Sequence, residues 1–399
     1  MEWKPLGHEG DNDANSYAVP KRWLRIHYYD ALNILFRVEN SLRLFVYVIL
    51  KAHHLDKWAD INIASEDGTD TTIAKQAKRR MHQAKSFGYL GYDITCPIMH
   101  LTAGELSHLI FKDPYWPIFG HYFLGDKAIM RTKLDEIGSI RNALAHFRPI
   151  KNDDVDVIKQ NAKHALGAIE DCLHNFLNTR QVVPTNTSDS WYTTVTPVGG
   201  GPCSVRLFQS SDEDWICIQL SYDCPEISHR FSESFRYWTV LTLNSSALLH
   251  YSPILTKYVI CLTETTSHSS VGKDEKKNTQ FTKHARFVFS KSVLAQAADE
   301  IKGELERLVL KISEESDLVL QDHLARGILV RSGSVTGRLQ GKEHKYWIHE
   351  RQGLRTPLRK DDPPEYWGTF GYFGSDFIAG SNEYPWMASE ISDDDDIPF

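Results

Sequence analysis

The sequence lacks the features by which several classes of protein are identified. Its six cysteines include no Cys-x-x-Cys pair and no zinc-ligand spacing, so nothing indicates a metal site or a required cofactor. Scattered thiols in a chain of 399 residues are typical of reduced, buried side chains in a cytosolic protein. No internal repeat of solenoid or propeller length occurs, so a repeat architecture is not expected.

Long apolar runs are also missing. The N-terminus, residues 1–13, is polar and has no apolar core of the signal-peptide type. The longest apolar run, Leu44 to Leu50, is far too short to span a membrane. We therefore expect a soluble cytoplasmic protein with no membrane partner.

A general excess of basic charge is absent as well. The formal net charge is −7, which argues against a protein that coats nucleic acid nonspecifically but is compatible with a local basic site. Part of the acidic excess lies in the last ten residues, so the rest of the chain is closer to neutral. The length and the ordinary apolar content predict two or three folded domains.

Periodic apolar residues predict a self-contained helical bundle over residues 21–180, preceded by a loose polar arm, residues 1–20. Apolar side chains recur at three- and four-residue steps along 21–54, 127–147 and 152–178. This spacing places them on one face of each helix, and such faces bury one another in a bundle.

Two further helices are expected within the bundle. Thr102 followed by Glu105 predicts a capping box at the start of one of them. The other, residues 71–87, is strongly basic. Its simpler explanation is a solvated face, and the alternative is an RNA-binding strip formed by Lys78, Arg79 and Arg80.

Beyond residue 180 the pattern changes to short runs of β-branched and aromatic residues between turns. Residues 181–330 are predicted to form an α+β, β-rich domain that ends with a helix over 291–313. Residues 331–390 lack periodicity and are expected to be extended or weakly folded, and 391–399 form an acidic peptide. The predicted fold is therefore multidomain, an all-α bundle followed by an α+β domain and an extended acidic tail.

The helical run that ends before Pro149 contains an unusual group of polar residues, Arg141, Asn142 and His146. An Arg-x4-His spacing alone is weak, because Arg22 and His27 repeat it. The simplest explanation is a polar helix end, in which the arginine pairs with Glu39, a carboxylate on an apolar stripe, and the histidine caps carbonyl groups.

The setting of these residues favours a catalytic site. Asn142 and His146 lie four residues apart on one helix face, near the helix end where a cation is favoured. Glu39 is a plausible buried counter-charge that orients Arg141. Metal-free RNA cleavage needs a base, an acid and a cation beside the phosphate. Because one histidine does not easily perform both proton transfers, a dimer is expected.

Residues 21–180 resemble a HEPN domain of the abortive-infection type. The resemblance lies in Arg141-Asn142-x3-His146, in Val38-Glu39-Asn40-Ser41-Leu42-Arg43, and in Trp58-Ala59-Asp60. It implies a metal-independent endoribonuclease that acts as a homodimer in a bacterial anti-phage or toxin-type system. It also implies that Arg141 and His146 are catalytic, that Asn142 and Glu39 support them, and that Arg43 is a weaker candidate.

The C-terminal tip resembles that of bacterial single-stranded DNA-binding protein, and it consists of Asp393, Asp394, Asp395, Asp396, Ile397, Pro398 and Phe399. A charge run is usually a solubilising tail. An aromatic ring, a proline and a free carboxylate, however, make a compact recognition unit for a basic-rimmed pocket. The resemblance implies docking onto host or phage proteins that bind that tip. The alternative to the nuclease is accordingly a non-catalytic adaptor that dimerises through the bundle and is recruited through the tail.

Overall fold

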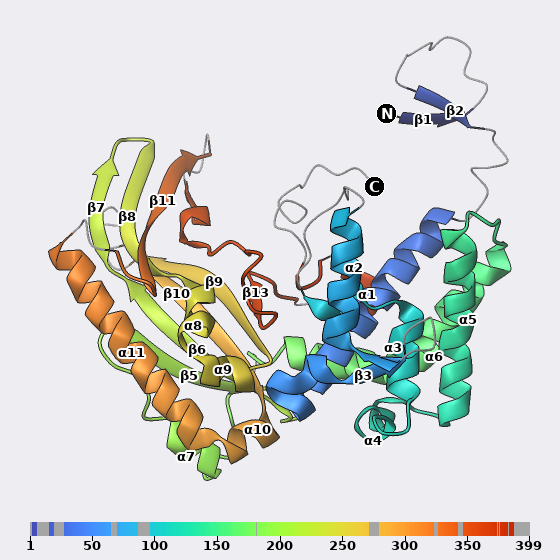
Figure 1. Cartoon of the computed structure of the whole chain (residues 1–399). Coiled ribbons are helices and arrows are strands. Elements are labelled where there is room, and N and C mark those ends of the chain that lie inside the picture. The colour runs from blue at the N-terminus through green and yellow to red at the C-terminus, as the bar shows by residue number, and fades with distance from the viewer. Residues whose placement is uncertain are drawn as a thin grey trace.

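The protein combines helices and β-sheets, which confirms the α+β content expected from the sequence. Figure 1 shows a helical part beside a β-rich part. No helix in the described portion of the chain is long and apolar enough to cross a membrane. The computed structural model describes residues 2–5, 16–19, 28–64, 70–86, 96–180, 182–270, 279–322, 326–341, 346–372, 374, 376–381 and 383–386.

The helical part is built around one central helix, α1. Its long helices are α1 (Tyr28–His54), α2 (Ile73–Ser86), α3 (Ala103–Phe111), α5 (Lys127–Ala145) and α6 (Asn152–Leu177). The shorter elements are η2 (Leu55–Asp60), β3 (Asn62–Ala64), β4 (Asp70–Thr72), η3 (Pro97–His100), α4 (Trp116–Phe119) and η4 (Gly120–Tyr122). In the predicted loose arm, β1 (Glu2–Pro5) and β2 (Ser16–Val19) pair in parallel, which the sequence pattern did not indicate.

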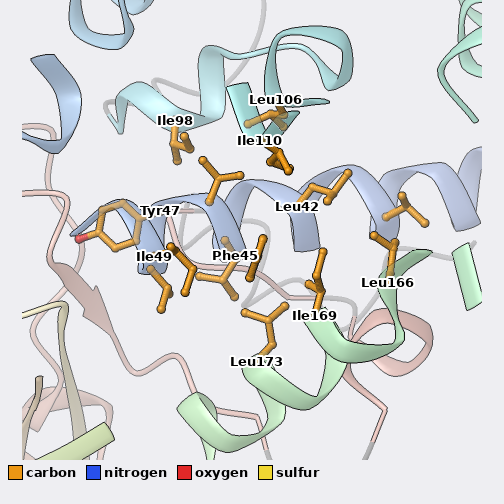
Figure 2. Close-up of a cluster of buried hydrophobic side chains, with 14 of the residues drawn as sticks. Leu42, Phe45, Tyr47, Ile49, Ile98, Leu106, Ile110, Leu166, Ile169 and Leu173 are labelled. Carbon is orange, nitrogen blue, oxygen red and sulfur yellow. The ribbon is translucent and has the colours of Figure 1, made fainter. Parts of the chain in front are cut away.

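Helix α1 is apolar around most of its second half because it is covered on opposite sides. Figure 2 shows Leu106 and Ile110 of α3 on one side of it, and Ile169 and Leu173 of α6 on the other. The run from Leu44 to Leu50 is fully buried as a result. The expected capping box is present at α3, where Thr102 N–H donates to Glu105 Oε2 at 2.9 Å.

In the residues that the structure describes, the β-rich part contains two sheets. The five-stranded sheet has the order β13-β9-β10-β6-β5 and contains β5 (Cys203–Gln209), β6 (Trp215–Cys224), β9 (Cys261–Ser270), β10 (Thr279–Ser290) and β13 (Tyr366–Gly368). The four-stranded sheet has the order β12-β11-β8-β7 and contains β7 (Glu226–Phe231), β8 (Phe235–Leu243), β11 (Val330–Gln340) and β12 (Tyr346–Glu350).

Helix α11 (Ala298–Gln321) covers the sheets on the side away from the helical part (Figure 1). The sequence predicted one helix over 291–313, whereas α10 (Lys291–Gln296) and α11 are separate and α11 is longer. The remaining elements are α7 (Ser190–Val195), α8 (Ser245–Tyr251), α9 (Pro253–Tyr258), η5 (Gln352–Leu354) and α12 (Phe377–Gly380). Within residues 181–330, strand β7 and the short helices α7, α8 and α9 were not predicted.

The helical bundle is not self-contained, because it shares its core with the five-stranded sheet. Successive residues of β6 face opposite sides, so Trp215 and Cys217 pack with the bundle while Ile216 and Ile218 pack in the other core, under α11. The Phe176 ring of α6 meets Trp215 edge-on at 5.2 Å between centroids. The expected boundary near residue 180 is therefore a change of secondary structure within a continuous core.

The described part of 331–390 is folded, contrary to the expectation of an extended or weak segment. Strand β13 pairs in parallel with β9, and Trp367 is buried in the bundle core. Lys51 of α1 forms a buried ion pair with Glu365, at 2.5 Å between Nζ and Oε1. The part of the segment around β13 contacts both β9 and α1, so its side chains do not follow the period of a single helix or strand face. Its order therefore comes from contacts distant in the sequence.

Candidate functional site

Helix α5 ends in a Schellman motif rather than at Pro149. Phe147 N–H donates to Leu144 O, and Arg148 N–H donates to Ala143 O, both at 2.9 Å. This arrangement requires a left-handed residue after the C-cap, and Phe147 supplies it with a φ of 55°. The helix therefore stops at Ala145, before the proline could act, and His146 is its C-cap.

Glu39 of α1 pairs with two arginines. Its Oε1 accepts a hydrogen bond from Arg43 Nη2, and its Oε2 lies 3.6 Å from Arg141 Nε. The expected pairing of Glu39 with an arginine on a facing helix is thus confirmed. The Glu39 side chain is only 14% exposed and that of Arg141 is 38% exposed. The buried carboxylate therefore holds a partly solvent-exposed guanidinium in a fixed position.

Arg43 anchors this carboxylate from below. Its Nε and Nη2 donate to the Leu101 carbonyl at 3.3 and 3.0 Å, and its Nη1 donates to Asn40 Oδ1 at 3.0 Å. Burial lowers the pKa of the Arg43 guanidinium, an effect that the charge of Glu39 opposes. These contacts use Arg43 inside the protein, where it holds the Glu39 carboxylate in place.

His146 differs from the arginine in having no partner for its ring. Within the described ranges no group forms a hydrogen bond or ion pair with its exposed imidazole, whereas its backbone N–H donates to Asn142 O at 3.2 Å. The simplest explanation of the motif therefore holds for Arg141, which pairs with Glu39, but not for His146, whose ring caps no carbonyl. Asn142 is exposed, and its Oδ1 lies 3.5 Å from Arg141 Nη1, a long contact.

Phe147 is a site candidate that the sequence did not indicate. Its side chain is 87% exposed, and its left-handed backbone is costly for a residue with a bulky side chain. In the sequence, the signal that could have indicated Phe147 is that it directly follows His146. A strained backbone that carries an exposed ring, beside an imidazole with no partner among the described residues, is more typical of binding than of stability.

A small, mostly apolar pocket lies between α1, α3 and α5 beside the Glu39–Arg141 pair. Its wall consists of Leu35, Val38, Leu42, Ala103, Ser107, Leu134, Ile137 and Gly138. Gly138 leaves open space here, since nothing lies within 4 Å of where its Cβ would be. The pocket gives Arg141 an apolar wall on one side and solvent on the other.

The basic helix α2 divides into exposed and engaged residues. Lys78 and Arg79 are exposed, as an RNA-binding strip requires. Arg80 instead makes a bidentate ion pair with Glu105, at 2.7 and 2.9 Å, and Glu105 is only 3% exposed. The structure thus places Arg80 in a structural pair, which differs from the RNA-binding role expected of it. Lys78 and Arg79 stay predictions.

The other predicted features add little to the geometry of this site. The tip, residues 393–399, lies outside the described residues. In the described portion no group of three or more His, Cys, Asp or Glu side chains could hold a metal ion. Comparison of the chain with protein-family models, with curated proteins and with solved structures finds no match.

Proposed function

We propose that the chain is a metal-independent endoribonuclease of HEPN type, with Arg141 and His146 as its catalytic residues. The observation that carries the proposal is that the Arg141 side chain has an ion-pair partner whereas the His146 side chain has none among the described residues. Arg141 is oriented by Glu39, while the imidazole of His146, about one turn further on, is exposed and has no partner among the described residues. A polar helix end kept only for stability would be expected to satisfy both.

The reaction that suits these groups is an internal transesterification of RNA. The 2′-oxygen attacks the adjacent phosphorus, the bond to the 5′-oxygen breaks, and a 2′,3′-cyclic phosphate and a 5′-hydroxyl result. His146 takes the proton of the 2′-hydroxyl or donates one to the leaving oxygen. Arg141 stabilises the charge that develops on the phosphorane, and Asn142 supports it. A second copy of the chain supplies the second histidine.

Phe147 has a part in this proposal as a platform for a base. Exposed aromatic rings bind single-stranded nucleic acid by stacking, and each stacked base contributes about 1–3 kcal/mol. Because Phe147 directly follows His146, a base on its ring would hold the adjoining phosphate near the imidazole. Lys78 and Arg79 could contact the backbone further along.

Full-length protein incubated with tRNA or mRNA in the presence of EDTA provides the test. Wild type should produce fragments ending in cyclic phosphate, and His146→Ala should reduce the rate by about 10²-fold or more. His164→Ala is a matched control, since His164 is an exposed histidine on α6 outside the site. Equal cleavage by wild type and His146→Ala would rule out this site.

A growth assay separates the nuclease from the adaptor alternative. A ribonuclease should slow growth of the host on expression, and Arg141→Ala should relieve that toxicity. An adaptor's effect should depend on Phe399 and not on Arg141. In the proposed system the tail docks on proteins that recognise the tip of single-stranded DNA-binding protein, in an anti-phage or toxin-type response. If that docking holds the nuclease silent, deletion of residues 391–399 raises toxicity.

A further inference from the structure

The five-stranded sheet presents two kinds of surface on the face that it turns to the helical part. Close to the bundle this face is apolar, with Cys217 and Val288 in the bundle core. One residue pair further along, β5, β6 and β10 carry Arg206, Gln219 and Arg286. Arg206 and Arg286 both pair with Gln219 in the strand register, so the three side chains point to the same face. We call these three residues the arginine row.

The arginine row is positively charged. Arg286 Nε donates to Gln219 Oε1 at 2.8 Å, but neither Arg286 nor Arg206 has a carboxylate partner in the part of the chain that the structure describes. Arg286 is half-buried, and this burial lowers its pKa. Arg180, three residues beyond the end of α6, lies close to the row, since burial and the charge of Arg286 lower the pKa of Arg180 to about 10. A half-buried cation without a counter-charge is costly unless an anion binds.

The next row of the same face adds neutral hydrogen-bonding groups. His284 lies opposite Ser221, and its Nδ1 is 2.9 Å from Ser221 Oγ while its Nε2 is 2.8 Å from Ser267 Oγ. Burial, and then the charges of Arg286 and Arg206, lower the pKa of His284 to about 4, so the ring is neutral at pH 7. The hydroxyl groups therefore bond to a neutral ring and add no negative charge.

We propose that the arginine row binds the phosphate groups of a small phosphorylated ligand, such as a diphosphate. Guanidinium forks match phosphate oxygens. The buried Gln219 amide accepts from Arg286 Nε and donates to Ser221 Oγ at 3.2 Å, so it holds the Arg286 fork in place. This site is distinct from the candidate nuclease site and does not depend on it.

The extent of the surface favours a small ligand over a nucleic-acid strand. Measured along the strands, this surface begins at the apolar residues Cys217 and Val288 of the bundle core. At the other end stands Asp223, which accepts a hydrogen bond from Thr282 Oγ1 at 3.0 Å. Asp223 is four residues from Gln219 along β6, or about 13 Å. That length suits one or two phosphates, whereas a nucleic-acid backbone needs a longer basic track.

Calorimetric titration of the full-length chain with inorganic pyrophosphate and with ADP tests the proposal. Wild type should bind both, and Arg286→Gln and Arg206→Gln should each weaken binding by about tenfold or more. Arg206 is exposed, so Arg206→Gln keeps the test valid if Arg286→Gln fails to fold. Arg230→Gln is the matched control, because Arg230 is an exposed arginine on β7 of the other sheet.

Three outcomes overturn the proposal. The first is that wild type binds neither pyrophosphate nor ADP at millimolar concentration. The second is that Arg206→Gln and Arg230→Gln bind as tightly as wild type. The third is that a single-stranded oligonucleotide binds more tightly than pyrophosphate and that Arg206→Gln and Arg286→Gln lose this binding. That result would assign the surface to nucleic acid. Loss of RNA cleavage in His146→Ala has no bearing on any of these outcomes.

Discussion

Alanine is ordinarily more stable than glycine in a folded chain, and the left-handed conformation of Phe147 predicts the opposite order at this position. At this residue, with its φ of 55°, glycine should be more stable than alanine. An L-residue in the left-handed region costs roughly 1–2 kcal/mol, and the extra freedom of glycine in the unfolded chain costs about 0.5–1 kcal/mol. Both substitutions remove the same ring, which is 87% exposed, so its lost contacts cancel in the comparison. Phe147→Gly should therefore exceed Phe147→Ala by about 0.5–1 kcal/mol in free energy of unfolding.

Chemical denaturation of the two variants measures this difference, and Gly138 of the same helix provides the control. Gly138 is an interior helical residue with open space at its Cβ position, so Gly138→Ala should stabilise by about 0.5–1 kcal/mol. Opposite signs at the two positions are the expected result. If alanine matches or exceeds glycine at position 147, the argument from backbone strain is wrong.

The same pair of variants separates stability from activity. If the Phe147 ring stacks on a base, both variants should cleave RNA more slowly, by about five- to a hundredfold, although one of them is relieved of strain. Retention of the full rate in both, with His146→Ala inactive, would leave the nuclease proposal intact and remove the role assigned to Phe147.

The remaining predictions concern buried charges. Lys51→Met leaves Glu365 buried without its partner and should lower the free energy of unfolding by about 3–5 kcal/mol in denaturant titration, with much of the loss recovered when Glu365→Leu is added. Arg80→Ala should destabilise by about 2–3 kcal/mol because Glu105 loses its bidentate partner, while RNA affinity of the folded variant stays unchanged. The pKa of His284, about 4, lies below its ordinary 6.5, so the unfolded chain binds this proton more readily. The free energy of unfolding should thus be highest above pH 6.5 and fall as the pH drops toward 4, and His284→Gln should reduce that slope.

Part of the candidate site could be predicted from the sequence. Its signals come from neighbouring residues or from a buried charge that needs an opposite charge beside it. Glu39 interrupts an apolar stripe, and a carboxylate in that position needs a cation, which the structure supplies as Arg43 on the same helix and Arg141 on the facing one. Arg43 follows Glu39 by one helical turn, so their ion pair is also a local signal, but the sequence could not show that the Leu101 carbonyl would hold Arg43 beside it. Nor could it show that Arg80 is engaged by Glu105, a residue 25 positions away.

The sequence by itself determined the helices whose apolar residues recur with helical spacing and the cap at Thr102, since periodicity and capping act within a few residues. Only the tertiary structure decided where those helices are covered. The buried pairing of Lys51 with Glu365 and the alignment of Arg206 with Arg286 both join residues far apart in the chain. Strand register and interior ion pairs depend on which surfaces meet, and no local pattern encodes that choice.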